Sequence, residues 1–143
     1  MCRGGHIAWT LLKHGYDVSC IDIVDRGYPM TRVEDYLKNN GYIDCDVITN
    51  PPYSQAKEFV EHTLNQMQAG CKCAFFLKLT FLEGEKRRSL FQKYPPKKIY
   101  VFTKRVNCAL NGNEEDFARS SAVCYAWFIW EKGSKTLPVI DWI

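Results

Sequence analysis

The sequence predicts an α/β domain, a three-layer sandwich in which helices cover both faces of a mostly parallel sheet. Short apolar segments alternate along the chain with segments of helical periodicity, which is the pattern of strands joined by crossover helices. The apolar segments are also continuous rather than alternately apolar and polar, as expected for strands covered on both faces. With 143 residues, 46% of them hydrophobic, the chain has the size of one domain with its own core.

Five apolar segments are the predicted strands. The third is nearly continuously apolar, and the last two are separated by a long polar loop without an evident helix. We therefore expect these last two to be antiparallel edge strands at the C-terminal end of the sheet. The predicted strands are residues 17–23, 45–49, 72–79, 98–103 and 122–130.

Three helices are predicted between the strands. Residues 6–14 form a short helix that begins after a pair of glycines. Residues 56–67 carry apolar side chains at helical spacing, with Ser54 as the N-cap and Gly70 as the stop signal. Residues 85–93 form a basic amphipathic helix.

The composition excludes several classes of protein. No run approaches the roughly 18 apolar residues of a membrane span, and the N-terminal segment does not have the pattern of a signal peptide. The seven cysteines lie at irregular spacings that match no zinc site. We therefore expect reduced thiols in a cytoplasmic protein without a metal.

Positive charge is concentrated in the second half of the chain. Residues 78–105 hold nine Lys and Arg and two Glu, a local charge of +7, whereas the whole chain has a net charge of +3. A basic half beside a slightly acidic half indicates a polyanionic partner. A solvated helix face is the alternative explanation of the same charges.

The segment “DVITNPPYS” ends a predicted strand in four unusual residues. A residue before proline is held extended, so Asn50 should project from the strand tip. Pro51 and Pro52 have fixed φ angles and no N–H, which makes a rigid turn. The side-chain oxygen of Asn50 and the carbonyl of Pro51 can then converge on one amino group, and Tyr53 offers a flat face beside them. This pattern predicts a grip for a planar amine; a proline-rich strand exit with a packed tyrosine is the alternative.

Two further features fall where ligands bind in open α/β sheets, outside the carboxyl ends of strands. Gly4 and Gly5 precede the first predicted helix, whose N-terminus offers free N–H groups. Asp22 ends the first predicted strand, where a carboxylate can accept hydrogen bonds from ribose hydroxyls. Asp25 is a neighbouring candidate. Together these residues indicate a site for a nucleoside.

These segments resemble the class I S-adenosylmethionine-dependent amino-methyltransferases, in particular the small phage and prophage DNA N6-adenine methyltransferases. The motif NPPY after a strand is typical of this class. The resemblance extends over nearly the whole chain, through the segments “GGHIAWTLLKHGYDVSCIDIVDRGY”, “DYL”, “FLEGEKRRSLF” and “YAWFIWEKG”.

The resemblance implies a Rossmann-like class I methyltransferase fold in a single domain, residues 1–143, with no separate target-recognition domain. In the family, the glycine loop follows a central first strand. Here Gly4 lies close to Met1, so this first central strand is expected to be missing and the chain to be truncated at its N-terminus.

The resemblance also implies roles for individual residues. Gly4 and Gly5 would line the methionine end of S-adenosylmethionine, Asp22 would bind its ribose, and Asp35 would bind its adenine amine. The residues that would hold the target base are Asn50, Pro51, Pro52 and Tyr53.

The partner implied by the resemblance is duplex DNA, from which an adenine is flipped into the NPPY site. The basic region would contact phosphates without reading sequence. The polar loop, residues 106–121, is the candidate for reading sequence. The residues expected to bind nucleic acid are Lys86, Arg87, Arg88, Lys104 and Arg105.

Two alternatives remain open. The first is a methyltransferase that acts on adenine in RNA or on a protein glutamine, because related sheets use NPPY for those amines. The second is a truncated, non-catalytic methyltransferase-like protein that binds nucleic acid. Recognition sequence and oligomeric state do not follow from the sequence.

Overall fold

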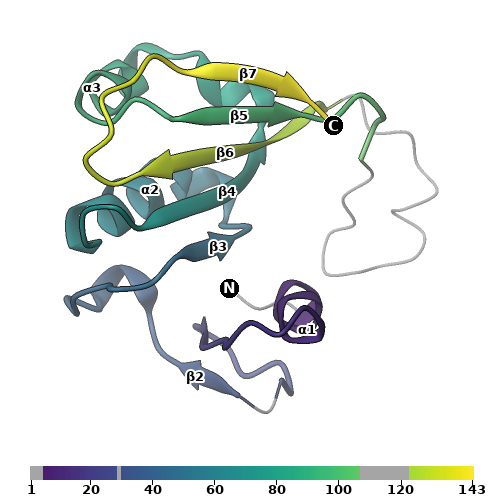
Figure 1. Ribbon diagram of the computed structural model, residues 1–143. Helices are drawn as coiled ribbons and strands as arrows, with labels where there is room; N and C mark the ends of the chain where they lie inside the picture. The colour runs from purple at the N-terminus through teal and green to yellow at the C-terminus, as the bar shows by residue number, and fades with distance from the viewer. Residues whose placement is uncertain (1–4, 29, 107–122) are drawn as a thin grey trace.

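The computed structural model describes residues 5–28, 30–106 and 123–143 as a mixed α/β fold (Figure 1). The strands are β1 (Cys20–Asp22), β2 (Thr31–Val33), β3 (Val47–Thr49), β4 (Lys72–Lys78), β5 (Lys98–Val101), β6 (Tyr125–Glu131) and β7 (Val139–Trp142). The α-helices are α1 (His6–Lys13), α2 (Ala56–Gln66) and α3 (Arg88–Lys93). Short 3-10 helices are η2 (Tyr36–Lys38), η3 (Tyr53–Gln55), η4 (Leu79–Leu82) and η5 (Glu85–Arg87).

The described strands form two sheets that share no ladder. β1 and β2 form a parallel pair, and the other five strands have the order β3-β4-β6-β5-β7. β6 is antiparallel to both of its neighbours, whereas β3 is parallel to β4 and β5 is parallel to β7. The carboxyl ends of β3, β4 and β5 therefore lie along the same edge of the larger sheet, and this edge carries the candidate site.

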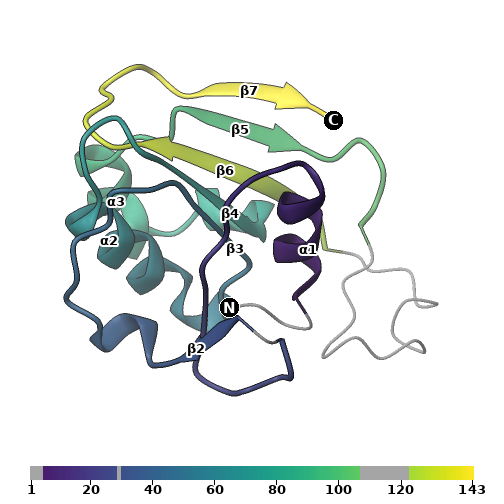
Figure 2. The same ribbon diagram turned by 60° about the horizontal axis from the view of Figure 1, so that its bottom comes forward.

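The main core lies between α2, α3 and one face of the five-stranded sheet (Figures 1 and 2). Apolar side chains of α2 repeat at helical spacing and pack on alternate residues of β4 and β6, which point to the same face. Phe75, Phe128 and Trp130 form its aromatic centre, with ring centroids 5.8 and 5.9 Å from that of Trp130. The indole N–H of Trp130 donates to the carbonyl of Tyr94 at 2.9 Å, so no polar group of this ring is left without a partner.

A second, smaller core joins α1 to the two-stranded sheet. It consists of Ala8, Cys20 and Tyr28, with Leu12 and Val18 packed against them. This core shares no buried residue with the main one. α1 thus packs on β1 and on the segments that flank it.

The five predicted strands are all present, mostly shorter than expected. The antiparallel pairing of the last two is confirmed, but their expected position at the edge is wrong. β6 lies inside the sheet because its fully buried Phe128 and Trp130 pack on the main core. The sequence does not predict two of the strands, β2 and β7. Each is short and mostly exposed, so neither shows a run of buried apolar residues.

The predicted helices are also present, with changes at their starts. Ser54 is not the N-cap of α2, because η3 precedes the helix and places Gln55 at that position, without a side-chain cap. The third helix begins as the 3-10 turn η5 and becomes α-helical at Arg88. None of the described helices is long and apolar enough to cross a membrane.

Candidate active site

The predicted amine grip lies at the carboxyl end of β3, next to the carboxyl end of β4. Pro51 is buried, Asn50 is half-buried, and Pro52 has the extended geometry expected of a rigid turn (φ −57°, ψ 124°). The carbonyl of Pro52 accepts a hydrogen bond from the N–H of Gln55 at 3.0 Å, which starts η3. In the described part of the chain, no donor reaches the side chain of Asn50 or the carbonyl of Pro51. Two acceptors are therefore available on this turn.

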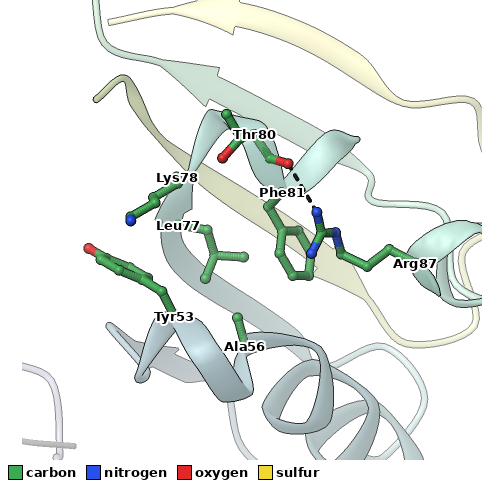
Figure 3. A pocket seen from close by; sticks show the side chains of 7 residues that line it. All are labelled: Tyr53, Ala56, Leu77, Lys78, Thr80, Phe81 and Arg87. Atoms are coloured by element: carbon green, nitrogen blue, oxygen red, sulfur yellow. Dashed lines mark hydrogen bonds between the residues drawn. The ribbon is translucent and has the colours of Figure 1, made fainter. Parts of the chain in front are cut away.

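Tyr53 borders a cavity of about 70 Å³ together with Leu77, Lys78 and Phe81 (Figure 3). The ammonium of Lys78 lies over the Tyr53 ring, 5.2 Å from its centroid. The ring also contacts Tyr125, at a centroid distance of 5.8 Å. Tyr53 is thus held by an aromatic neighbour and a cation.

Arg87 closes one wall of the same cavity. Its guanidinium donates to the carbonyls of Thr80 and Glu83 and lies 5.1 Å from the centroid of the Phe81 ring (Figure 3). These bonds fix the segment that follows β4. Arg87 therefore has a clear structural role, in addition to the nucleic-acid contact expected from the sequence.

The other basic candidates lie in exposed positions near the same edge. Lys86 and Arg88 follow β4 in η5 and α3, and Lys104 and Arg105 follow the carboxyl end of β5. β4 and β5 run in the same direction, so both groups belong to the edge that carries the amine grip. The expected sequence-reading loop, residues 106–121, lies outside the described residues except for Val106.

A second cavity, of about 130 Å³, lies at the carboxyl ends of β1, β2 and β3. It brings together the two predicted acidic residues, Asp22 and Asp35, and its wall includes Pro52 of the amine grip. Ile21, Ile23 and further residues complete its lining. Parallel strands place their carboxyl ends side by side, which explains why residues far apart in the sequence meet here.

Asp22 is only 2% exposed, and one of its oxygens lacks a hydrogen bond. Oδ1 accepts the N–H of Val24 at 3.3 Å, whereas Oδ2 has only an ion pair with Nε of Arg26, at 3.6 Å. A buried carboxylate oxygen without a donor is costly unless a ligand supplies one. Asp22 is therefore suited to accept hydrogen bonds from a ligand hydroxyl.

Both carboxylate oxygens of Asp35 already have partners in the protein. Its Oδ1 accepts the N–H of Leu37 at 3.2 Å and caps η2, and its Oδ2 lies 3.5 Å from the ammonium of Lys38. The cap orients the side chain, and both partners leave lone pairs of the carboxylate unused. It remains a candidate acceptor for an amine.

Gly5 is the N-cap of α1 and has a positive φ of 71°. A Cβ atom at this position would lie 2.4 Å from the ring of Tyr28, so the local fold requires glycine here. Gly4 lies outside the described residues. The structure thus gives Gly5 a packing role, and its expected role toward a cofactor stays a prediction.

Sequence reasoning missed two aromatic residues of the second cavity, Tyr36 and Phe59. Their rings stack at 5.5 Å, and the hydroxyl of Tyr36 bonds to that of Thr63 at 2.8 Å. Burial raises the pKa of Tyr36, against the opposing effect of the Thr63 hydrogen bond. Phe59 is one of the apolar residues of the helix predicted at 56–67. Helical spacing indicates that such a residue is buried, but it cannot show that the same face also borders a cavity.

No protein-family model and no curated protein matches the sequence. Among solved structures, a protein of Listeria monocytogenes assigned to the class I S-adenosylmethionine-dependent methyltransferases superposes on 96% of this chain, with 16% identity and a TM-score of 0.59. The fold is that of a class I methyltransferase. The complex of M1.HpyAVI with S-adenosylmethionine covers 71% of this chain and 57% of that protein, with 12% identity and a TM-score of 0.36.

The chain spans about half of the Listeria protein, 53% of its length. Within this class I methyltransferase fold, both cavities lie at the carboxyl ends of strands, which is where open α/β sheets bind ligands. The position of the site therefore agrees with the architecture.

Proposed function

We propose that this chain is an S-adenosylmethionine-dependent methyltransferase that acts on the N6 amino group of adenine in DNA. The observation that supports it most is the position of the turn at residues 50–53 between two cavities. Pro52 borders the cavity that contains Asp22, and Tyr53 borders the cavity that contains Lys78. Methyl transfer requires the donor and the acceptor amine to lie next to each other. The turn borders one cavity that could hold the donor and one that could hold the amine.

The residues of the larger cavity fit the nucleoside part of S-adenosylmethionine. The Oδ2 atom of Asp22, which lacks a hydrogen bond, would accept one from a ribose hydroxyl. The carboxylate of Asp35 would accept one from the adenine amine. Ile21 and Ile23 supply apolar surface for the adenine ring. When bound, the cofactor supplies an electrophilic methyl group on a positively charged sulfur.

Asn50 and Pro51 would prepare the acceptor amine. The nitrogen of adenine N6 is a poor nucleophile, because its lone pair is delocalised into the ring. Two acceptors that each accept a hydrogen bond from one N–H of the amine favour a pyramidal nitrogen. The lone pair is then less delocalised and can attack. Because the amine is neutral, no general base has to act before attack, and positioning and electrostatics are the main catalytic effects.

Tyr53 would hold the flipped base. Removing a base from duplex DNA costs a few kcal/mol, and stacking on an aromatic side chain contributes about 1–3 kcal/mol. The contacts of Tyr53 with Tyr125 and Lys78 keep its ring in place before the base arrives. The grip is therefore largely formed in advance.

The exposed basic residues favour a nucleic acid, and not a protein, as the macromolecule. Lys86, Arg88, Lys104 and Arg105 lie near the edge that carries the grip, where they can contact phosphates on either side of a flipped nucleotide. A cytoplasmic protein with access to DNA is implied by this function.

The test is methyl transfer from labelled S-adenosylmethionine to three substrates offered in parallel: duplex DNA that contains adenine, RNA that contains adenine, and a protein mixture. We expect label in DNA. Label in RNA or protein alone would support a different substrate, and no label together with no binding of S-adenosylhomocysteine by calorimetry would contradict the proposed activity.

A further inference from the structure

Lys78 is the last residue of β4, and its side chain points across the mouth of the cavity beside Tyr53 (Figure 3). β4 pairs with β3 in parallel, so the end of β4 lies next to the turn at residues 50–53. The Lys78 ammonium is 5.2 Å from the centroid of the Tyr53 ring. It is therefore a cation at the place where the target base is expected.

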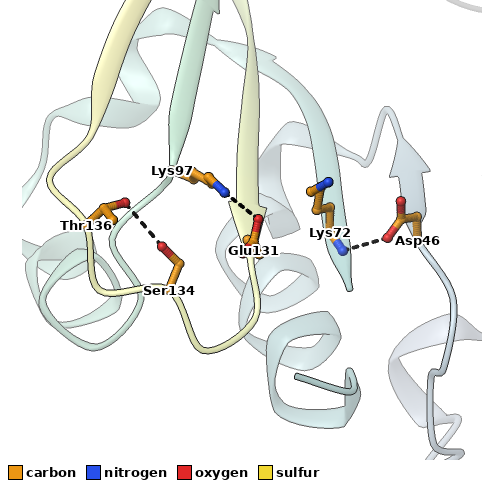
Figure 4. A network of polar contacts seen from close by, with 6 residues as sticks. All are labelled: Asp46, Lys72, Lys97, Glu131, Ser134 and Thr136. Atoms are coloured by element: carbon orange, nitrogen blue, oxygen red, sulfur yellow. Dashed lines mark hydrogen bonds and ion pairs between the residues drawn. The ribbon is translucent and has the colours of Figure 1, made fainter. Parts of the chain in front are cut away.

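The charge of Lys78 has no opposite charge near it in the described part of the chain. Lys97, just before β5, binds Glu131 at 2.5 Å (Figure 4). Lys98, the first residue of β5, binds Asp141 at 2.8 Å. The ammonium of Lys78 makes no ion pair and no hydrogen bond with the described residues, and the cavity beside it is lined by no Asp or Glu. Its three N–H donors are available.

The backbone around Lys78 is held firmly. The N–H of Leu79 donates to the carbonyl of Cys124 at 2.8 Å, and Arg87 binds the carbonyls of Thr80 and Glu83 on the following segment. Arg87 thus uses donors on its own chain, whereas the donors of the Lys78 ammonium remain available to a ligand.

The chemistry of an ammonium decides which part of a nucleotide it can take. It donates only, so it does not compete with Asn50 and Pro51 for the hydrogens of the target amine. The acceptor that suits it best is an anionic oxygen, because charge-assisted hydrogen bonds are stronger than contacts with a ring face. In DNA that oxygen belongs to a phosphate.

We propose that Lys78 contacts the phosphate next to the flipped nucleotide and is thus a substrate-binding residue of the target site. The hydroxyl of Thr80, exposed at the same cavity, is a second donor for this phosphate. Lys78 covers the Tyr53 ring while the site is empty and moves to the phosphate when the base enters. This inference rests on the proposed function, since it takes DNA as the ligand.

The test is the salt dependence of DNA binding by three variants of the full chain. Fluorescence anisotropy with a labelled duplex oligonucleotide is measured between about 50 and 200 mM salt. Lys78→Met should weaken binding at the lowest salt and lower the slope of log K against log salt by about 1. Lys78→Arg keeps the charge and should retain the slope.

The matched control is Lys72→Met, at the amino end of the same strand. Lys72 is exposed, lies at the far edge from the grip, and contacts Asp46 only through its backbone N–H, at 2.7 Å (Figure 4). Its variant should bind DNA like the wild type, and circular dichroism should show all variants folded. A slope for Lys78→Met equal to that of Lys72→Met would overturn the role of Lys78.

The same measurements separate this inference from the proposed function. DNA binding that depends on Lys78 without methyl transfer would contradict the proposed activity and leave the phosphate contact in place. Methyl transfer by a Lys78→Met variant with unchanged salt slope would contradict the phosphate contact alone. If the wild-type chain binds no DNA at any salt concentration, both fail.

Discussion

Two oxygens at the end of β3 are the residue-level features on which the proposed chemistry depends. The side-chain oxygen of Asn50 and the carbonyl of Pro51 accept no hydrogen bond from the described residues, although Pro51 is buried and Asn50 half-buried. Both oxygens are therefore available to accept hydrogen bonds from a ligand. A substrate amine with two hydrogens supplies both donors.

Replacing Asn50 by Ala should lower the rate of methyl transfer about 100-fold, the usual effect of removing one preorganised polar group from an active site. The fold should be unaffected, because Asn50 supports no described hydrogen bond. Steady-state rates measure the effect. Asn40→Ala, at an exposed position, is the control. Equal rates for both variants would remove Asn50 from the mechanism.

Replacing Asp22 by Asn should weaken binding of S-adenosylhomocysteine at least about tenfold, because hydrogen bonds to a charged acceptor contribute about 1.5–3 kcal/mol. Asn keeps the size of the side chain and the bond to Val24, so packing is preserved. Calorimetry gives the dissociation constants. The control is Asp17→Asn, on an exposed carboxylate; an unchanged affinity for Asp22→Asn would show that the ligand does not use this oxygen.

The residues of the two cavities were predictable to different degrees. The NPPY turn could be predicted from the sequence, because two prolines directly after a strand have few structural uses. Asp22 follows from its place at a strand end. The position of Lys78 at the site could not be predicted, since in the sequence it is one of nine basic residues in the region 78–105. Its selection depends on the pairing of β3 with β4.

At the scale of elements, α1 depends on one glycine. Gly5 begins the helix with a positive φ and lies against Tyr28, so α1 meets the β1–β2 sheet at very close range. This contact joins the only described helix of the smaller core to its strands. A side chain at residue 5 would separate them.

Replacing Gly5 by Ala should lower the free energy of unfolding by more than replacing Gly15 by Ala. Both positions have positive φ, 71° and 83°, and share a backbone strain of about 1–2 kcal/mol. Only Gly5 adds a steric overlap, since nothing lies within 4 Å of a Cβ at Gly15. Overpacking adds about 1–3 kcal/mol.

Urea unfolding of the two variants measures this difference. Because the strain is common to both, the excess loss in Gly5→Ala reports the packing of α1 on Tyr28. Equal losses in the two variants would contradict the close contact.

Elements with a buried, continuous apolar pattern were predictable, and short exposed ones were not. β4 has five consecutive apolar residues within its seven, whereas β2 is the three-residue segment Thr31–Val33, half-exposed or exposed throughout. β2 exists because β1 provides a parallel partner, and β7 because β5 does. Tertiary pairing, not local pattern, determines both.

In the molecule as a whole, the described residues form a five-stranded sheet with a large core and a two-stranded sheet with a small one. The larger cavity lies between them, with Asp22 on one sheet and Pro52 at the end of a strand of the other. A ligand in this cavity would touch both parts and couple them. Two-stranded sheets are marginally stable alone.

Hydrogen exchange should reveal this division. Amides of β1 and β2 should exchange faster than those of β4 and β6, because opening the smaller part exposes fewer buried apolar groups. S-adenosylhomocysteine should slow exchange in β1 and β2 by binding to both parts. Mass spectrometry of peptides from each sheet measures the rates, and uniform protection without ligand would contradict a separate smaller core.

If residues 50–53 present an adenine amine to a methyl donor, the methylated atom must be adenine N6, and this atom can be identified directly. Duplex DNA is incubated with the protein and a donor carrying a deuterated methyl group, and the nucleosides are analysed by mass spectrometry. We expect deuterated N6-methyladenine with the wild-type chain and its loss in Asn50→Ala. A label on cytosine, or one that persists unchanged in Asn50→Ala, would contradict it.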